Sequence, residues 1–135
     1  MTTPELFRLD GRVALVTGGA GIYGRHIVQA LAEAGTHVVA VSRDEEHCRR
    51  FASELTARGL AVNADRCDLG DEAGIIALRD RLLARHGRLD VLFNNVHLAS
   101  DPGHVFLRPV LHALFRPLPA VAQQKLTQPL PRSSG

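Results

Sequence analysis

The feature that most constrains this chain is a glycine-rich turn between a short apolar run and a segment with helical spacing. Val13–Thr17 is an unbroken apolar run rich in β-branched residues, and Gly18, Gly21 and Gly24 follow it. A helix N-terminus presents unpaired N–H groups and a partial positive charge, which glycine allows an anion to approach closely. We expect Gly18 to make the tight turn, Gly21 to open the approach and Gly24 to let helix and strand pack. The stretch therefore predicts a phosphate-binding turn.

The same alternation of apolar runs and helical spacing continues to about residue 95. Buried strands are expected at residues 13–17, 37–42, 61–67 and 89–94, with helices at about 22–34, 44–58 and 71–86. Strand and helix alternating at this interval are typical of βαβ units and a parallel sheet. Because the crossovers are right-handed, we predict an α/β, Rossmann-like, doubly wound sheet of about four strands in the order 3-2-1-4. The first two helices should cover one face and the third helix the other.

Each predicted helix has one apolar stripe and a glycine at its end. The expected buried positions are Ile27, Ala30, Leu31 and Ala34 in the first helix, Cys48, Phe51 and Leu55 in the second, and Ile75, Leu78 and Leu82 in the third. Gly35, Gly59 and Gly87 stand just past the three helices, where a left-handed residue commonly ends a helix.

The character of the chain changes after Asn95. Six of the seven prolines and the single lysine, Lys125, lie in residues 96–135. Residues 1–95 carry 12 Lys/Arg and 13 Asp/Glu, whereas residues 96–135 carry four and one. We therefore expect two parts: a nucleotide-binding domain at 1–95 and a proline-rich, irregular tail at 96–135.

Several classes of function are excluded by composition. No apolar run is long enough to span a bilayer, and the first residues lack the charged and apolar regions of a signal peptide, so a cytoplasmic protein without membrane association is expected. Cys48 and Cys67 form no C-x-x-C pair and are expected to be buried and reduced, and the seven histidines show no metal-ligand spacing. The positive charge lies in the tail and forms no basic stripe with aromatic residues, which argues against nucleic-acid binding.

The end of the second strand bears on which dinucleotide would bind. An acid near this strand end accepts from the ribose of NAD, whereas a basic residue favours the extra phosphate of NADP. Here Ser42 is followed by Arg43, which favours NADP over NAD. Asp44 is expected to cap the next helix. The alternative for Arg43 is a solvated loop arginine.

Three stretches together carry a family resemblance. GRVALVTGGAGIYGRHIVQALAEAG, CDLGDE and GRLDVLFNNV resemble, in order and spacing, the short-chain dehydrogenase/reductase family over residues of about 6 to 96. The resemblance implies that Asp68 and Leu69 lie beside the adenine of a nicotinamide dinucleotide. It also implies that Asn94 and Asn95 brace the sheet and the cofactor. With the glycine turn and Arg43, the predicted cofactor-binding residues are Gly18, Gly21, Ile22, Tyr23, Arg43, Asp68, Leu69 and Asn95.

The chain departs from the family pattern at two places. The glycines read T-G-x-x-G-x-x-G, whereas single-domain members have T-G-x-x-x-G-x-G, so Gly21 stands one position early. Val96 and His97 replace the Ala-Gly that follows the two asparagines in the family, and no further family motif follows. The resemblance therefore covers only the cofactor-binding half.

The catalytic residues implied by the family have no counterpart in this sequence. The family uses a tyrosine as acid/base, with a lysine four residues later that lowers the tyrosine pKa, and a serine that holds the substrate oxygen. Tyr23 is the only tyrosine, and Ile27 stands four residues after it. No Tyr-x-x-x-Lys exists, so no catalytic residue is assigned. The acids Asp65, Asp68, Asp71 and Glu72 are expected to be charges at a helix start rather than a catalytic pair.

Three hypotheses follow for the function. The first is an NAD(P)-dependent oxidoreductase of the short-chain type, truncated or frame-shifted after residue 95 and inactive alone. Its basic residues are nearly all arginine, fifteen of sixteen, which indicates a GC-rich gene whose out-of-frame reading yields such a tail. The second is a non-catalytic dinucleotide-binding module, and the third is an unstable fragment. In each case the exposed edge at Val91, Leu92 and Phe93 is expected to promote homo-oligomer formation.

Overall fold

The computed structural model describes residues 1–95, and the predicted tail at 96–135 lies outside this part of the chain. Within it the elements follow in the order α1 (Thr3–Leu6), β1 (Val13–Thr17), α2 (Gly24–Glu33), β2 (His37–Ser42), α3 (Glu45–Ala57), β3 (Val62–Arg66), α4 (Glu72–His86) and β4 (Val91–Asn94). The four strands are parallel and lie in the order β3-β2-β1-β4, with β1 pairing β2 and β4, and β2 pairing β3. This confirms the predicted sheet.

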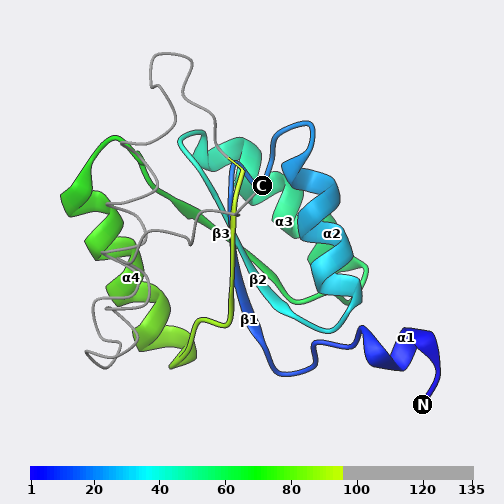
Figure 1. Ribbon diagram of the computed structural model, residues 1–135. Helices are drawn as coiled ribbons and strands as arrows, with labels where there is room; N and C mark the ends of the chain where they lie inside the picture. The colour runs from blue at the N-terminus through cyan, green and yellow to red at the C-terminus, as the bar shows by residue number, and fades with distance from the viewer. Residues whose placement is uncertain (96–135) are drawn as a thin grey trace, which may run out of the picture.

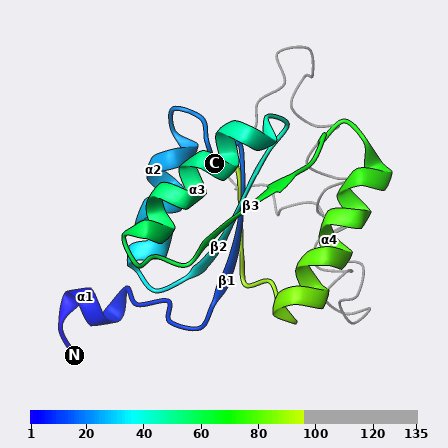
Figure 2. The same ribbon diagram turned by 180° about the vertical axis from the view of Figure 1, so that it is seen from behind.

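The sheet is sandwiched between two helical layers. In Figure 1, α2 and α3 lie on one face of the sheet and α4 lies on the other. The view from behind shows the same separation, with the short α1 standing away from the three layers (Figure 2). This is the arrangement of right-handed crossovers in a doubly wound sheet, as predicted from the alternation of elements.

Alternate residues of the strands supply two separate cores. Leu15, Val39 and Val41 point to the α4 face, where they pack with Ile75, Leu78 and Leu82. Ala14, Val16, Val38 and Ala40 point to the opposite face and pack under α2 and α3. Since successive side chains of a strand alternate between faces, apolar runs without polar breaks bury both faces at once.

Two of the three predicted helix stripes are confirmed, and the third is confirmed only in part, with Ile27 and Leu31 packed against the core. Cys48, Phe51 and Leu55 of α3 are buried, as are the three expected positions of α4. In α2 the buried residues are Gly24, Val28 and Ala32. The predicted Ala30 is exposed, and Ile27, Leu31 and Ala34 are only half-buried. Val28 and Ala32 stand four and eight residues after Gly24 and therefore lie on the same face of the helix as Gly24, which packs on the glycine turn.

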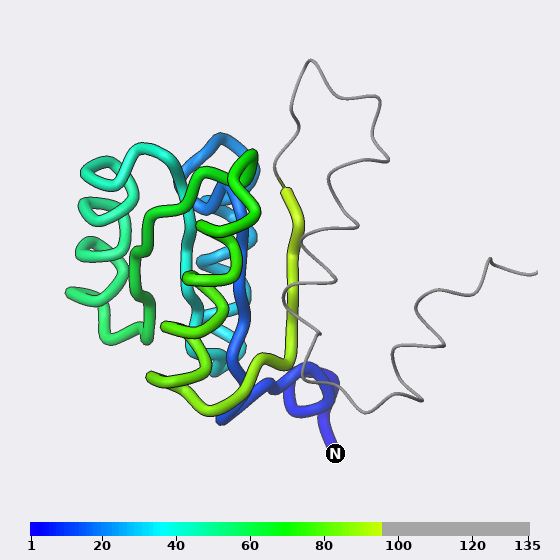
Figure 3. Tube along the Cα trace, turned by 90° about the vertical axis from the view of Figure 1, so that its left-hand side faces the viewer, coloured from blue at the N-terminus to red at the C-terminus, as the bar shows by residue number. Residues whose placement is uncertain are grey.

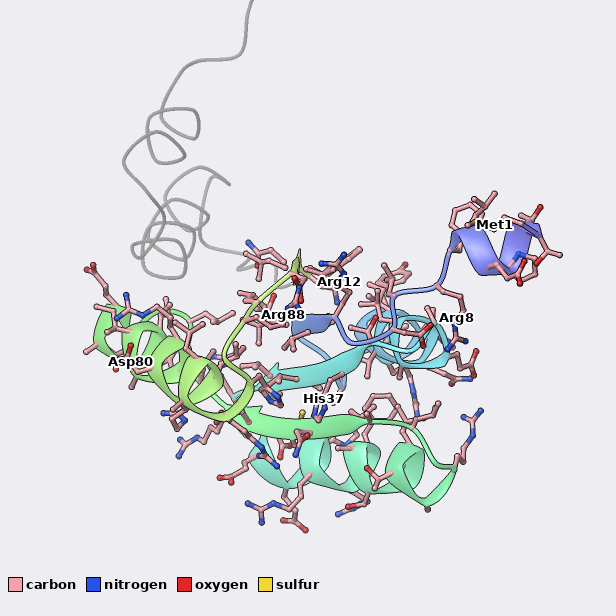
Figure 4. All side chains as sticks on the ribbon, turned by 90° about the horizontal axis from the view of Figure 1, so that it is seen from below. Met1, Arg8, Arg12, His37, Asp80 and Arg88 are labelled. Carbon is pink, nitrogen blue, oxygen red and sulfur yellow. The ribbon has the colours of Figure 1, made fainter. Side chains whose placement is uncertain are left out.

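The third and fourth strands are shorter than predicted. β3 spans Val62–Arg66, and β4 begins two residues later than expected. Asp90 accounts for the later start, because its carboxylate accepts from Val13 N–H at 2.8 Å and from Arg88 Nε at 2.8 Å. Arg12 reaches the same carboxylate at 3.5 Å, and Arg12 and Arg88 lie close together at this end of the sheet in Figure 4. The turn before β4 is therefore fixed to the start of β1.

β4 forms one edge of the four-stranded sheet described here, opposite β3 (Figure 3). Val91 and Leu92 are half-buried, and Phe93 is 43% exposed. The edge therefore presents apolar side chains as well as backbone groups.

Candidate functional site

The turns after β1, β2 and β3 meet at the carboxyl edge of the sheet. They lie together at the top of Figure 1 and enclose a cleft of about 280 Å³. Gly18, Val41, Ser42, Arg43, Asp44, Cys67, Asp68, Leu69 and Gly70 line it. Ligands of open α/β sheets bind at this edge, where the strand order reverses. The structure thus brings Gly18, Arg43, Asp68 and Leu69 of the predicted set into one cleft.

The glycine turn is held together by contacts that leave no room for side chains at two positions. Gly18 has a φ of +63°. A Cβ on Gly24 would lie 1.9 Å from Gly18 O, so the first helical residue packs directly on the turn. A Cβ on Gly19 would lie 2.7 Å from the Ala40 Cβ, so the turn also packs on β2. The close-packing role predicted for Gly24 is thus directed at the turn, and the role of Gly19 was not predicted.

The N-terminus of α2 lacks the capping found on the next two helices. Tyr23 at its N-cap makes no side-chain hydrogen bond, and the first turn contains no acid. Within residues 1–95, the N–H groups of Ile22 and Tyr23 donate no hydrogen bond to the protein. By contrast, α3 and α4 are capped by Asp44 and Asp71 and carry acids in their first turns. Of these three helices in the described part of the chain, α2 is therefore the one whose positive end is open toward an anion.

The predicted residues Gly21, Ile22 and Tyr23 do not line the cleft. The side chains of Ile22 and Tyr23 are 82% and 76% exposed. Their backbone N–H groups remain available to an anion on the turn.

The turn after β2 places three polar residues beside the cleft. Asp44 Oδ1 accepts from His47 N–H at 3.0 Å, which confirms the predicted helix cap. Ser42 Oγ accepts from Asp44 N–H at 3.2 Å. Arg43 is exposed and lines the cleft. The Asp44 carboxylate is thus held against its own helix, and Arg43 supplies the positive charge that lines the cleft at this turn.

The turn after β3 supplies one apolar and one acidic wall. Leu69 is buried, and Asp68 Oδ1 accepts from Gly70 N–H at 2.9 Å. Burial raises the pKa of the Cys67 thiol, which keeps it protonated at neutral pH. Asp65 pairs with Arg81 at 2.9 Å. Asp71 caps α4 and Glu72 lies in its first turn, as expected from the sequence, whereas Asp65 belongs to β3 and not to the helix start.

The end of β4 is bonded to the end of β1 through a buried hydroxyl. Thr17 Oγ1 donates to Asn94 Oδ1 at 3.0 Å and accepts from Asn95 N–H at 2.9 Å. Asn94 and Asn95 thereby brace the carboxyl edge of the sheet, although Asn95 does not line the cleft. Thr17 was not predicted to take part, because an isolated threonine at a strand end carries no distinctive pattern.

A second unpredicted contact joins the glycine turn to α3. The His47 ring Nε2 lies 3.2 Å from Ala20 O. Since a carbonyl oxygen only accepts, Nε2 carries the proton.

Between residues 1 and 95 the structure contains no group of three or more residues suited to a metal ion. The helices of that same part are too short or too polar to cross a membrane.

A parallel 3-2-1-4 sheet with a glycine turn at its carboxyl edge is the architecture of Rossmann-like nucleotide-binding domains. The sequence matches the short chain dehydrogenase family over residues 12–107, and the chain belongs to that family.

Individual relatives agree with this assignment. The chain is 39% identical over 93 residues to D-threitol dehydrogenase of Mycolicibacterium smegmatis, covering 69% of this chain and 36% of the relative. It is 45% identical over 89 residues to the rhamnolipids biosynthesis 3-oxoacyl-[acyl-carrier-protein] reductase of Pseudomonas aeruginosa, covering 66% and 34%. The solved Pseudomonas aeruginosa RhlG/NADP active-site complex superimposes with a TM-score of 0.74 at 34% identity, over 89% of this chain and 52% of that chain. The chain thus spans about a third of these curated relatives and half of the solved structure.

Proposed function

We propose that this chain is the dinucleotide-binding half of a short-chain oxidoreductase, that it binds NADP(H) in preference to NAD(H), and that it has no turnover by itself. The observation that carries the proposal is the cleft formed by Gly18, Arg43, Asp68 and Leu69 beside the uncapped N-terminus of α2. A nicotinamide dinucleotide, when bound, donates or accepts a hydride. The protein's own residues would bind and orient it.

The cleft suits the adenosine end of such a ligand. Its volume of about 280 Å³ is near the lower limit for small-molecule sites and smaller than a whole dinucleotide requires. Leu69 offers an apolar wall to the adenine, and Asp68 keeps one carboxylate oxygen in addition to the one bonded to Gly70. That oxygen can accept from an exocyclic amino group. The pyrophosphate would then lie over Gly18 and Gly21 and accept from Ile22 and Tyr23 N–H.

The preference for NADP(H) rests on the groups at the end of β2. Arg43 is an exposed cation on the cleft wall, whereas the neighbouring carboxylate, Asp44, accepts from His47 N–H. A guanidinium pairs well with a phosphate monoester through two parallel hydrogen bonds. The solved Pseudomonas aeruginosa RhlG structure, at 34% identity, is an NADP complex. Both observations support NADP(H).

The absence of turnover rests on the residue inventory. Tyr23 and Lys125 are the only tyrosine and lysine of the 135 residues, and they are not spaced as an acid/base pair. Tyr23 also lies in the glycine turn, on the phosphate side of the site. The same observations support a non-catalytic dinucleotide-binding module. The two proposals differ in whether the bound dinucleotide takes part in hydride transfer at all.

A titration of the full chain tests the proposal. We expect the nicotinamide fluorescence of NADPH to increase on binding and the melting temperature of the protein to rise. NADH should have the same effects at higher concentration. Carbonyl reduction should be undetectable. Lack of binding by either dinucleotide contradicts the proposal, and measurable reduction contradicts the inactive state. Reading the gene in the other two frames past codon 95 tests the frame-shift explanation, which requires a Tyr-x-x-x-Lys within roughly 50 to 70 codons.

We also propose that the apolar edge at Val91–Asn94 promotes self-association, since parallel edge strands with apolar side chains pair readily. Sedimentation of the full chain and of Phe93→Lys tests this: the charge should shift the protein toward monomer. A monomeric unmodified chain would contradict it.

A further inference from the structure

The glycine turn is tethered to its neighbours at two consecutive residues. Gly19 N–H donates to Val41 O at 3.2 Å, which ties the turn to the end of β2. Ala20 O accepts from His47 Nε2 at 3.2 Å, which ties it to the first turn of α3. The next residues make only local backbone bonds, from Gly21 N–H to Gly18 O at 3.1 Å and from Ile27 N–H to Tyr23 O at 3.2 Å. The side chains of Ile22 and Tyr23 are exposed. Within residues 1–95, His47 is therefore the side chain that ties the turn to a neighbouring element.

His47, in the first turn of α3, is also bonded to the β2–α3 turn that carries Arg43. Its backbone N–H donates to Asp44 Oδ1, and Asp44 N–H donates to Ser42 Oγ. His47 thus bonds the turn after β2 through its backbone N–H and the glycine turn after β1 through its ring. This connection makes the two turns, 27 residues apart at Ala20 and His47, a single unit.

We infer that His47 is a positioning residue, which presets the glycine turn for the pyrophosphate without touching the ligand. This inference rests on the proposed function. A turn already ordered before binding loses less conformational freedom on binding, so the tether should strengthen the affinity for any ligand that uses the turn. It should contribute nothing to a ligand that uses only the Arg43 side of the cleft.

The inference is tested with His47→Leu and His47→Gln in the full chain and three probes: NADPH, NADH and adenosine 2′-monophosphate. The last has a 2′-phosphate for Arg43 but no pyrophosphate for the glycine turn. We expect His47→Leu to weaken NADPH and NADH by the same factor, roughly three- to tenfold, because one hydrogen bond is lost. Adenosine 2′-monophosphate should bind unchanged. His47→Gln, whose amide N–H can replace Nε2–H, should restore most of the loss.

Arg50→Leu is the matched control, because Arg50 lies on the exposed face of α3 and pairs with Glu46. His47 is itself exposed, so its replacement leaves the core intact, and the melting temperature of each variant checks this. Equal weakening of all three probes, or no change in any, overturns the inference while leaving the proposed function standing. Failure of the unmodified chain to bind either dinucleotide overturns both.

Discussion

The hydroxyl of Thr17 donates to Asn94 Oδ1 at 3.0 Å, across 77 positions of sequence. The same oxygen accepts from Asn95 N–H, and Thr17 is completely buried. We expect Thr17→Val to leave both partners without a bond and to lower the free energy of unfolding by about 1–3 kcal/mol. Urea denaturation measures the loss.

Thr36 provides a contrasting case for the same substitution. It is also completely buried, but within residues 1–95 its Oγ1 has no hydrogen-bond partner. Thr36→Val should therefore be neutral or stabilise the protein by up to about 1 kcal/mol, since a buried unpaired hydroxyl is replaced by a methyl group. An equal loss of stability in Thr17→Val and Thr36→Val would show that the hydrogen bonds of Thr17 to Asn94 and Asn95 do not stabilise the fold.

Arg43 should decide between the two dinucleotides. Removing its charge-assisted contact to a 2′-phosphate should weaken NADPH roughly tenfold or more in Arg43→Ala while leaving NADH within about twofold. Isothermal titration with each dinucleotide measures the two affinities. Arg58→Ala is the control, because Arg58 pairs with Glu33 at the far end of α3. Parallel loss for both dinucleotides would mean that Arg43 does not contact the 2′ position.

Gly24 should be the least replaceable glycine of the turn. In Gly24→Ala the added Cβ would meet the backbone oxygen of Gly18 at 1.9 Å, so turn and helix must separate. We expect dinucleotide binding to be lost and the melting temperature to fall. In Gly74→Ala, within α4, the nearest atom is the Asp71 side-chain carboxylate at 3.2 Å and no backbone atom lies as close, so that variant should bind normally. Normal binding by Gly24→Ala would refute the close packing of the turn.

His86 should make the stability depend on pH. Burial, followed by the nearby His37 and Arg85, lowers the pKa of His86 below its usual 6.5. The two imidazole rings are 4.4 Å apart, and Asn63, with its amide oriented to satisfy both neighbours, donates to His37 Nε2 and accepts from Arg85. His37 lies at the amino-terminal edge of the sheet in Figure 4. Protonation of His86 would therefore place a second cation beside Arg85.

The direction of the pH effect follows from which state binds the proton more tightly. Because the folded pKa of His86 is depressed, the unfolded chain takes up the proton first as the pH falls below about 6.5. The stabilisation is complete above that pH and is lost below it, toward the folded pKa. Urea unfolding between pH 8 and pH 5 should show this slope, and His86→Gln should reduce it. The exposed His26→Gln should not; an unchanged slope in His86→Gln would assign the effect to other groups.

Local patterns determined the fold of this protein. The order of strands and helices, the stripes of α3 and α4, the glycine stops and the Asp44 cap all follow from residues within a turn or two of one another. A parallel sheet with right-handed crossovers then leaves little freedom in the strand order. The glycine turn was identified in the same way, because backbone conformation and helix polarity are local properties.

The tertiary structure decided what the site is made of. α2 buries Val28 and Ala32, and not Ala30, on the face of Gly24, which contacts Gly18 O. The bond of His47 to Ala20 joins segments that only the crossover brings together. Neither residue pair has a spacing that a helix or strand period could reveal, because the distance between them is set by packing. The sequence therefore determined which turns meet, and packing determined which side chains hold them.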